Sequence, residues 1–218
     1  HFIDPKTGLV RGDIPLSTIK DHHYRVSSCY ANCMAGMTSL EADRLQLNNP
    51  LSKYDYTALL IEYFYNGDYF EDDLCENSIA GDANVFPFYC DLIDDPEVFT
   101  HCLRSMQMEG LEDPFPLRYT KRTSILARTN ILGWFAPNYE GNTIWAHLGM
   151  CFLYVLQKMN SPLFAQYLES YEVLINKHKN FLELYHPDGT PYRTFFYVTD
   201  CNMSWAIMFA HLAWPASH

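Results

Sequence analysis

The feature that most limits how this chain can fold is a series of segments in which apolar residues recur every three or four positions. That period is typical of amphipathic helices. Residues 24–47 show it first, and Asn48-Asn49-Pro50 predicts where this helix ends. Residues 52–65 show it next, with Ser52 as the predicted N-cap and Asn66-Gly67 as the predicted stop. Further helices are predicted at residues 82–93, 96–108, 142–158, 162–178 and 202–213.

The alternation with a period of two that marks a half-buried strand is scarce, so the sequence predicts an all-α fold. Helices joined alternately by short turns and long loops are typical of helical hairpins packed around a shared core. No fixed-length repeat is visible, which favours a toroid over a solenoid. With 218 residues, 48% of them hydrophobic, the chain fits one domain, residues 1–218, better than two.

The longest predicted loop covers residues 110–139. It contains three prolines and, near its end, the aromatic residues Trp134 and Tyr139. Loops of this length in compact domains are usually functional or disordered, and the aromatic residues favour an ordered, functional loop. We therefore expect this segment to form one wall of a binding site.

Charge and hydropathy exclude two classes of partner. The formal net charge is −11 and no cluster of Lys and Arg is present, whereas phosphate backbones require one, so a nucleic-acid partner is not expected. No apolar run reaches the roughly 18–20 residues of a membrane span, and no signal-peptide pattern opens the chain, so no membrane partner is expected either. The sequence predicts a soluble protein.

The cysteines indicate a reducing compartment. There are seven of them, an odd number without paired CxxC motifs, so most are expected to be small buried residues of a cytoplasmic protein. Cys29 and Cys33 lie one helical turn apart but have no second pair nearby. His22 and His23 are adjacent, and metal-binding spacings such as HxxxH are absent. We predict no catalytic metal and no cofactor, while a structural calcium ion at residues 71–73 remains an alternative.

One carboxylate stands out because of its neighbours. Glu183 lies among Phe181, Leu182, Leu184 and Tyr185, directly before the His-Pro-Asp-Gly sequence at 186–189. A charge in an apolar environment is costly unless the site uses it. Glu183 is therefore either a solvated residue of a turn or a catalytic base.

A second motif, "PNYEGNTIWAHLG" at residues 137–149, places a Tyr, a Gly and a Trp before a predicted helix. Together with residues 181–194 and the Ser-Trp pair at 204–205, it resembles the C-terminal half of the six-hairpin, (α/α)6-barrel glycosidases. The strongest likeness is to glycoside hydrolase family 63, the trehalases and the glucosidase domains of debranching enzymes, and it spans roughly residues 30–214. The matching positions are Tyr139, Gly141, Trp145, Glu183, Tyr185, Pro187, Gly189, Ser204 and Trp205.

The resemblance implies an enzyme that hydrolyses an α-glucoside or α-mannoside with inversion, with Glu183 as the general base. Inversion also requires a general acid on the other side of the sugar, about 6.5–9.5 Å away. Asp21, which precedes a long predicted helix, is the chosen acid and Asp13 is the reserve, although a carboxylate at this position can also serve only as an N-cap. Asp188 and Asp200 compete for either role.

The resemblance also implies side chains for an oligosaccharide or glycoside substrate. Aromatic rings can stack on sugar faces, although each can equally be a core residue. Arg118 and Asn84 can bind hydroxyl groups. The alternative for Arg118 is an ion pair with an acidic residue, and in the segment that holds Asn84 a helix cap by Asp82 is the alternative to sugar binding. The aromatic candidates are Trp134, Tyr139, Trp145, Tyr185 and Trp205.

About seven predicted helices are fewer than the twelve of a closed barrel. We therefore expect either a barrel whose N-terminal half lies outside this chain, a homo-oligomer, or a reduced toroid. Two other functions remain open for the same shape. One is a sugar epimerase or lyase in which Tyr or His carries protons, and the other is a non-catalytic carbohydrate-binding domain.

Overall fold

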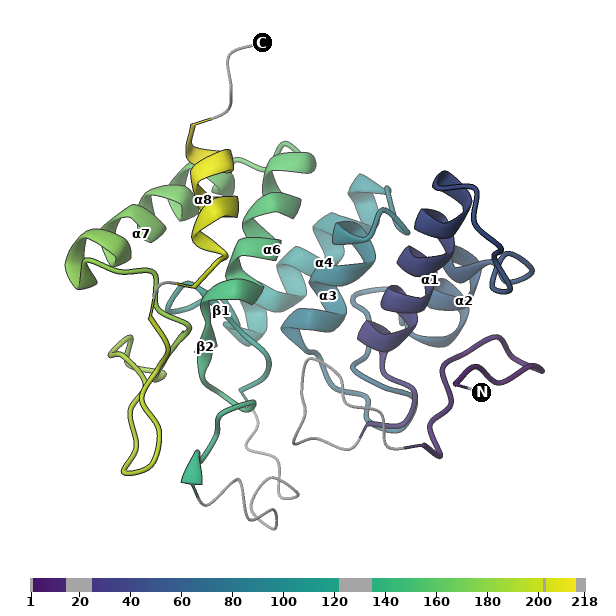
Figure 1. Cartoon of the computed structure of the whole chain (residues 1–218), viewed down its shortest axis with the longest axis horizontal. Helices are drawn as coiled ribbons and strands as arrows, with labels where there is room; N and C mark the ends of the chain where they lie inside the picture. The colour runs from purple at the N-terminus through teal and green to yellow at the C-terminus, as the bar shows by residue number, and fades with distance from the viewer. Residues whose placement is uncertain (1, 15–24, 122–134, 202, 215–218) are drawn as a thin grey trace. The chain divides into compact units, whose positions relative to one another are not determined.

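The structure, a computed structural model, describes residues 2–14, 25–121, 135–201 and 203–214 (Figure 1). The chain divides into two compact units, His1–Glu109 and Gly110–His218. The described residues contain seven helices and one small three-stranded sheet. The predicted helix-rich fold is thus confirmed, and the sheet is an addition to it.

The described part of the first unit contains four helices, α1 (Cys29–Arg44), α2 (Tyr56–Tyr63), α3 (Gly81–Tyr89) and α4 (Pro96–Glu109). Helix α1 packs against α2 and α3, and α3 packs against α4 (Figure 1). Each of these helices was expected from the sequence, and the ends of α1, α2 and α3 differ from the predicted ones by up to five residues.

The start of α2 corrects one prediction. Asp55, and not Ser52, is the N-cap, since its carboxylate accepts the backbone N–H of Ala58 at 3.0 Å. Ser52 instead donates its hydroxyl to the carbonyl of Asn49, in the turn before the helix. The predicted cap was wrong because both side chains suit an N-cap, and only the path of the backbone selects between them.

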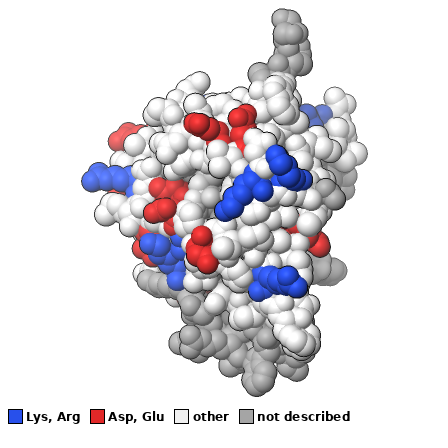
Figure 2. Space-filling model, turned by 90° about the vertical axis from the view of Figure 1, so that its left-hand side faces the viewer, with Lys and Arg blue, Asp and Glu red and all other residues white. Residues whose placement is uncertain are grey.

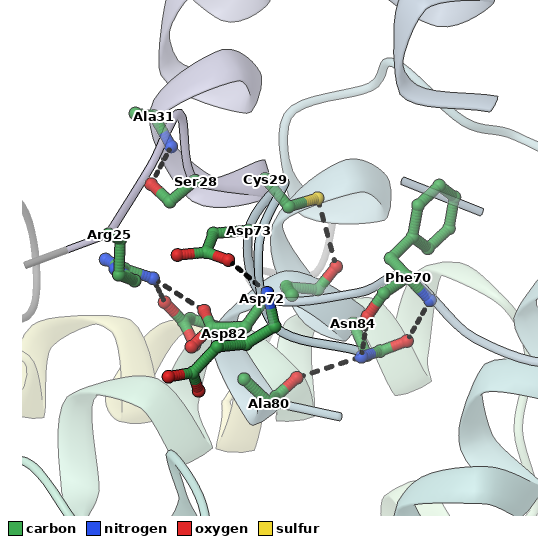
Figure 3. A network of polar contacts seen from close by, with 12 residues as sticks. Arg25, Ser28, Cys29, Ala31, Phe70, Asp72, Asp73, Ala80, Asp82 and Asn84 are labelled. Atoms are coloured by element: carbon green, nitrogen blue, oxygen red, sulfur yellow. Dashed lines mark hydrogen bonds and ion pairs between the residues drawn. The ribbon is translucent and has the colours of Figure 1, made fainter. Parts of the chain in front are cut away.

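A buried ionic cluster connects three segments of the first unit (Figure 3). The guanidinium of Arg25 contacts the carboxylates of Asp72 and Asp82, each at 2.8 Å, and Asp82 lies fully buried in the first turn of α3. Burial by itself lowers the pKa of Arg25, but the two carboxylates outweigh burial and hold that pKa above its ordinary value. The cluster therefore keeps its charges in a region where a single unpaired charge would be costly.

The acidic run at residues 71–73 has ordinary structural roles. Asp72 pairs with Arg25 (Figure 3). Asp73 accepts the backbone N–H groups of Val26, Cys75 and Glu76. These two carboxylates fix the loop before α3 to the segment that leads into α1. Internal contacts thus use Asp72 and Asp73, two of the three acidic side chains at residues 71–73, and the calcium ion stays a prediction.

The second unit is built around α6 (Ala146–Lys158), which is buried along most of its surface. Helices α7 (Leu163–His178) and α8 (Ala206–Ala213) pack against α6 (Figure 1). The strands β1 (Leu117–Arg118), β2 (Ile144–Trp145) and β3 (Leu184–Tyr185) form an antiparallel sheet in the order β1-β2-β3. Strand β2 leads directly into α6, so the sheet sits at the N-terminal end of that helix.

Two helices of the second unit begin later than predicted, and the sheet accounts for one of them. Helix α6 starts at Ala146 and not at residue 142, because Ile144 pairs with Arg118 and Tyr185 in the sheet. Helix α8 starts at Ala206, while α4 and α7 follow their predictions closely. The sequence did not reveal the sheet because strands of two residues are too short to show a period of two.

All seven cysteines lie in described residues, where five are buried and none forms a disulfide. None of the described helices has the length and apolar character that crossing a membrane requires. On the face drawn in Figure 2, basic and acidic side chains are interspersed, so the net negative charge is not gathered into one patch there.

Candidate functional site

Glu183 is held by its backbone at the meeting point of three segments of the second unit. Its carbonyl accepts the N–H of Ala146, the first residue of α6, at 2.9 Å. Its N–H donates to the carbonyl of Asp200 at 3.0 Å. Glu183 immediately precedes β3, so the sheet fixes its position relative to the start of α6.

The carboxylate of Glu183 is buried, with 9% of the residue exposed. The turn in this motif begins only at His186, where the N–H of Gly189 donates to the carbonyl of His186. The interpretation of Glu183 as a solvated turn residue is therefore wrong. The anomaly seen in the sequence, a carboxylate among apolar neighbours, is a real feature of the structure.

Three donors hold this carboxylate. The hydroxyl of Tyr139 donates to Oε1 at 2.9 Å, the hydroxyl of Tyr197 donates to Oε2, and the backbone N–H of Asp200 donates to Oε2 at 3.3 Å. No Lys or Arg among the described residues forms an ion pair with Glu183. Neutral hydrogen-bond donors, and not a cation, therefore compensate for the burial of this carboxylate among the described residues.

The two tyrosines can act only as donors toward Glu183. Burial raises the pKa of Tyr139, and the hydrogen bond with Tyr197 and the charge of Glu183 raise it further. Burial and the hydrogen bond to Glu183 likewise raise the pKa of Tyr197. Both phenols thus stay protonated at neutral pH.

The two oxygens of the Glu183 carboxylate accept different numbers of hydrogen bonds. An ionised carboxylate accepts about four hydrogen bonds, two at each oxygen. Two described groups donate to Oε2 and one donates to Oε1. Oε1 therefore keeps one acceptor position that a water molecule could fill.

An aromatic cluster surrounds the carboxylate. The ring of Tyr139 makes edge contacts with Trp145, Tyr197 and Tyr192, at centroid distances of 4.7, 5.3 and 6.1 Å. The indole N–H of Trp145 donates to the carbonyl of Tyr139 at 2.9 Å. This contact explains why the Tyr-x-Gly motif and the Trp that follows it occur together, because the Trp fixes the loop that carries Tyr139.

Two loops supply the hydroxyl donors. Residues 135–143 carry Tyr139 and residues 186–199 carry Tyr197, and both loops extend from the end of the second unit at which α6 begins (Figure 1). The hydroxyl of Tyr192 donates to the carbonyl of Pro137 at 2.9 Å and joins the two loops.

Among the predicted sugar-binding rings, Tyr139 contacts Glu183 directly. Trp145 and Tyr185 are both buried, so they support the site from inside and expose no face to a sugar. Trp205 is half-buried and lies beside His147, with ring centroids 5.6 Å apart, and His147 in turn contacts Trp145. Trp205 therefore remains a candidate for sugar stacking.

Arg118 lies on β1 and is buried. Its guanidinium donates to the carbonyl of Asp113, and its Nε has no partner among the described residues. Burial lowers the pKa of Arg118, and the negative charges of Asp113 and Glu112, which act to raise it, only partly offset this effect. No described contact joins Arg118 to Glu183, so its role as a hydroxyl ligand stays a prediction.

Asn84 does not serve as a sugar ligand in this structure. Its residue exposure is 0%, and its side-chain amide exchanges hydrogen bonds with the backbone N–H and C=O of Phe70 and also donates to the carbonyl of Ala80 (Figure 3). These bonds use both amide hydrogens. Asn84 fastens the loop before α3, a role that the sequence could not distinguish from hydroxyl binding.

The structure describes only one of the two residues first considered as the general acid. Asp21, like the aromatic candidate Trp134, lies outside the described residues. Asp13 is exposed and forms an ion pair with Arg11, and the hydrogen bond from Arg11 lowers its pKa. A carboxylate held in its ionised form is poorly suited to donate a proton, so Asp13 is a weak reserve.

Asp188 has the same limitation, because its carboxylate accepts two hydrogen bonds from Thr190 that lower its pKa. Asp200 contributes backbone groups to Glu183, and its side chain is exposed. Neither residue displaces Asp21 as the proposed acid.

The sequence reasoning missed Tyr197, Tyr192 and His147. Tyr197 comes 14 residues after Glu183, beyond a hairpin whose tip, Phe195-Phe196, lacks the Gly or Asn of common two-residue turns. His147 was part of the quoted motif, and in the structure its Nε2 lies 3.2 Å from the hydroxyl of Tyr119. No local pattern points to these contacts.

A scan against models of known protein families finds no match to this chain, and a search of curated proteins finds no relative. The resemblance to the six-hairpin glycosidases therefore depends on the motif residues, and the activity that it implies is a proposal.

Proposed function

We propose that this protein is an inverting glycoside hydrolase acting on an α-glucoside or α-mannoside, with Glu183 as its general base. The observation that carries the proposal is the buried carboxylate of Glu183, oriented by Tyr139 and Tyr197 and with one acceptor position left on Oε1. A general base requires a fixed orientation, and the three hydrogen bonds to the carboxylate supply one.

In the proposed reaction a water molecule donates a hydrogen bond to Oε1 of Glu183. The oxygen of this water attacks the anomeric carbon while its proton passes to Glu183, and the bond from the anomeric carbon to the leaving oxygen breaks on the opposite face. The leaving oxygen takes a proton from the general acid, for which Asp21 stays the proposed residue. The configuration at the anomeric carbon is thereby inverted.

The proposal includes the fold implied by the resemblance, a toroid of helical hairpins over residues 1–218. The helix-rich described residues are compatible with it. We propose that such a toroid is completed by an N-terminal half outside this chain or by a second copy of the chain.

The pKa values of the two tyrosines count against an epimerase or lyase that uses a tyrosine as its base. Such a base must lose its proton near neutral pH, whereas burial raises the pKa of both Tyr139 and Tyr197. A non-catalytic binding domain needs no such chemistry and is separated from the hydrolase only by experiment.

Product analysis tests the proposal. The chain is incubated with α-glucosides and α-mannosides, and the first-formed anomer is followed by proton NMR. An inverting hydrolase releases the β-anomer first. An unsaturated product that absorbs in the ultraviolet would indicate a lyase, and binding without any product would indicate a binding domain.

A further inference from the structure

Next to the Glu183 site, three phenylalanines form an exposed aromatic cluster, here named the Phe tip, which consists of Phe135, Phe195 and Phe196. Phe195 is 91% exposed and Phe196 is 64% exposed. Phe196 makes edge contacts with both other rings, each at a centroid distance of 4.7 Å. Neighbouring exposed aromatic rings lose the stabilisation that burial gives, so such a cluster usually marks a binding surface.

The Phe tip is held in one conformation by hydrogen bonds. Phe195 and Phe196 are the two central residues of a hairpin turn in which the N–H of Thr194 donates to the carbonyl of Tyr197 at 2.7 Å. The hydroxyl of Thr194 accepts the N–H groups of Phe196 and Tyr197 and donates to the carbonyl of Phe135 at 2.8 Å. One hydroxyl thus fixes both parts of the cluster.

The Phe tip lies on the same two loops that hold the carboxylate of Glu183. Tyr197, which donates its hydroxyl to Glu183, directly follows Phe196, and Tyr139 lies on the loop that begins at Phe135. A hydrogen bond from the hydroxyl of Tyr192 to the carbonyl of Pro137 also joins the loops that carry Tyr197 and Tyr139. The loops that orient Glu183 therefore also carry the Phe tip.

We infer that the Phe tip binds a second sugar ring of the substrate, so that the substrate class is an oligosaccharide and not a simple glycoside. This inference rests on the proposed function. Sugars are flat-faced, with C–H groups on their faces and hydroxyl groups around their rims, and the flat apolar rings of Phe complement those faces. The carboxylate and hydroxyl groups around Glu183 act on the ring that reacts, and the Phe tip adds apolar surface for the ring beside it.

The experiment compares substrates with and without a second ring. The trisaccharide maltotriose, or α-mannotriose if the protein prefers mannosides, carries additional rings. The glycosyl fluoride of the same sugar has a single ring, because its leaving group is one atom. The test variant is Phe195→Ala, since this side chain is nearly fully exposed and its removal leaves the core intact.

We expect Phe195→Ala to lower kcat/KM for the trisaccharide about 10-fold and to leave kcat/KM for the fluoride within about twofold. Phe195→Trp, which keeps an aromatic ring, should retain the activity on the trisaccharide. Ile207→Ala is the matched control, because Ile207 is an apolar residue of α8 that is 74% exposed. Equal losses on both substrates, or no loss on either, would overturn the inference.

A binding measurement separates the failure of this inference from the failure of the proposed function. If the parent protein cleaves neither substrate, the hydrolase proposal fails, and the Phe tip is then judged from NMR titrations with the trisaccharide and the monosaccharide. Tighter binding of the trisaccharide that Phe195→Ala abolishes would support the inference. Equal binding of the two sugars, or no binding at all, would refute it.

Discussion

The hydroxyl of Tyr139 donates a 2.9 Å hydrogen bond to Oε1 of Glu183, a residue 44 positions further along the chain. This contact joins the two sequence motifs that resemble the six-hairpin glycosidases. Tyr197 binds the other oxygen, so the orientation of the carboxylate depends on loops from both motifs.

Replacement of Glu183 by Gln should lower turnover about 100-fold or more, because the amide cannot accept a proton from water. The change should appear mainly in kcat, since Gln keeps nearly the same shape and the fold should be retained. The measurement is steady-state hydrolysis of the glucoside or mannoside that the parent protein cleaves, with circular dichroism to check the fold.

Asp188→Asn is the control for this substitution, because it changes a carboxylate to an amide in the exposed turn of the same motif. We expect turnover close to that of the parent. Full activity in Glu183→Gln would remove the proposed mechanism and favour the binding-domain alternative.

Tyr197→Phe should reduce kcat by about 10-fold or more, because it removes one hydrogen bond to an ionised carboxylate, and such a bond contributes about 1.5–3 kcal/mol. KM should change less, since the lost contact orients the base and does not bind the sugar. Steady-state kinetics on the same substrate give both parameters.

The matched control is Tyr192→Phe, which removes a hydroxyl from the same hairpin. That hydroxyl donates to the carbonyl of Pro137 and not to Glu183. If both variants lost kcat equally, the effect would come from the conformation of the hairpin, and Tyr197 would have no special role at the carboxylate.

Asp82→Ala should destabilise the first unit by about 1.5–3 kcal/mol, because it removes one charged hydrogen bond of the buried Arg25 and leaves the one to Asp72. Urea denaturation measures the free energy of unfolding. Glu41→Ala, which breaks an exposed pair with Arg44 on α1, should cost no more than about 1 kcal/mol. Equal losses from the two substitutions would mean that burial adds nothing to the pairing with Arg25.

Stability should fall between about pH 10 and pH 12. Burial raises the pKa of Tyr56, Tyr185 and Tyr192 to about 12, from an ordinary value of 10.0. A group whose pKa is raised in the folded state stabilises that state fully below the unfolded pKa, and this stabilisation is lost as the pH rises toward the folded pKa. Free energies of unfolding at pH 8 and pH 11 should therefore differ, with the lower value at pH 11.

Tyr56→Phe tests the cause of this loss. The hydroxyl of Tyr56 is buried without a hydrogen-bond partner among the described residues, so its removal should cost little at pH 8. The variant should also lose less stability than the parent between pH 8 and pH 11. An unchanged pH dependence would mean that ionisation of Tyr56 does not contribute to alkaline unfolding.

The sequence by itself determined the helical segments and the unusual position of Glu183. Helices such as α4 and α7 were predictable because apolar periodicity is a local property of consecutive residues. Glu183 was identifiable because its apolar neighbours are adjacent to it in the sequence. Turn residues such as Gly189, with φ of 77°, were also predictable, since glycine tolerates positive φ.

The tertiary structure alone decided which side chains surround that carboxylate and which apparent ligands serve the fold. Tyr197 reaches Glu183 because a hairpin turns back on β3. The side chain of Asn84, by contrast, is hydrogen-bonded to the backbone of Phe70. The three two-residue strands are likewise paired across long distances in the chain. Hydrogen bonds of this kind depend on how packed elements bring distant residues together, and the spacing of residues along the sequence carries no record of that geometry.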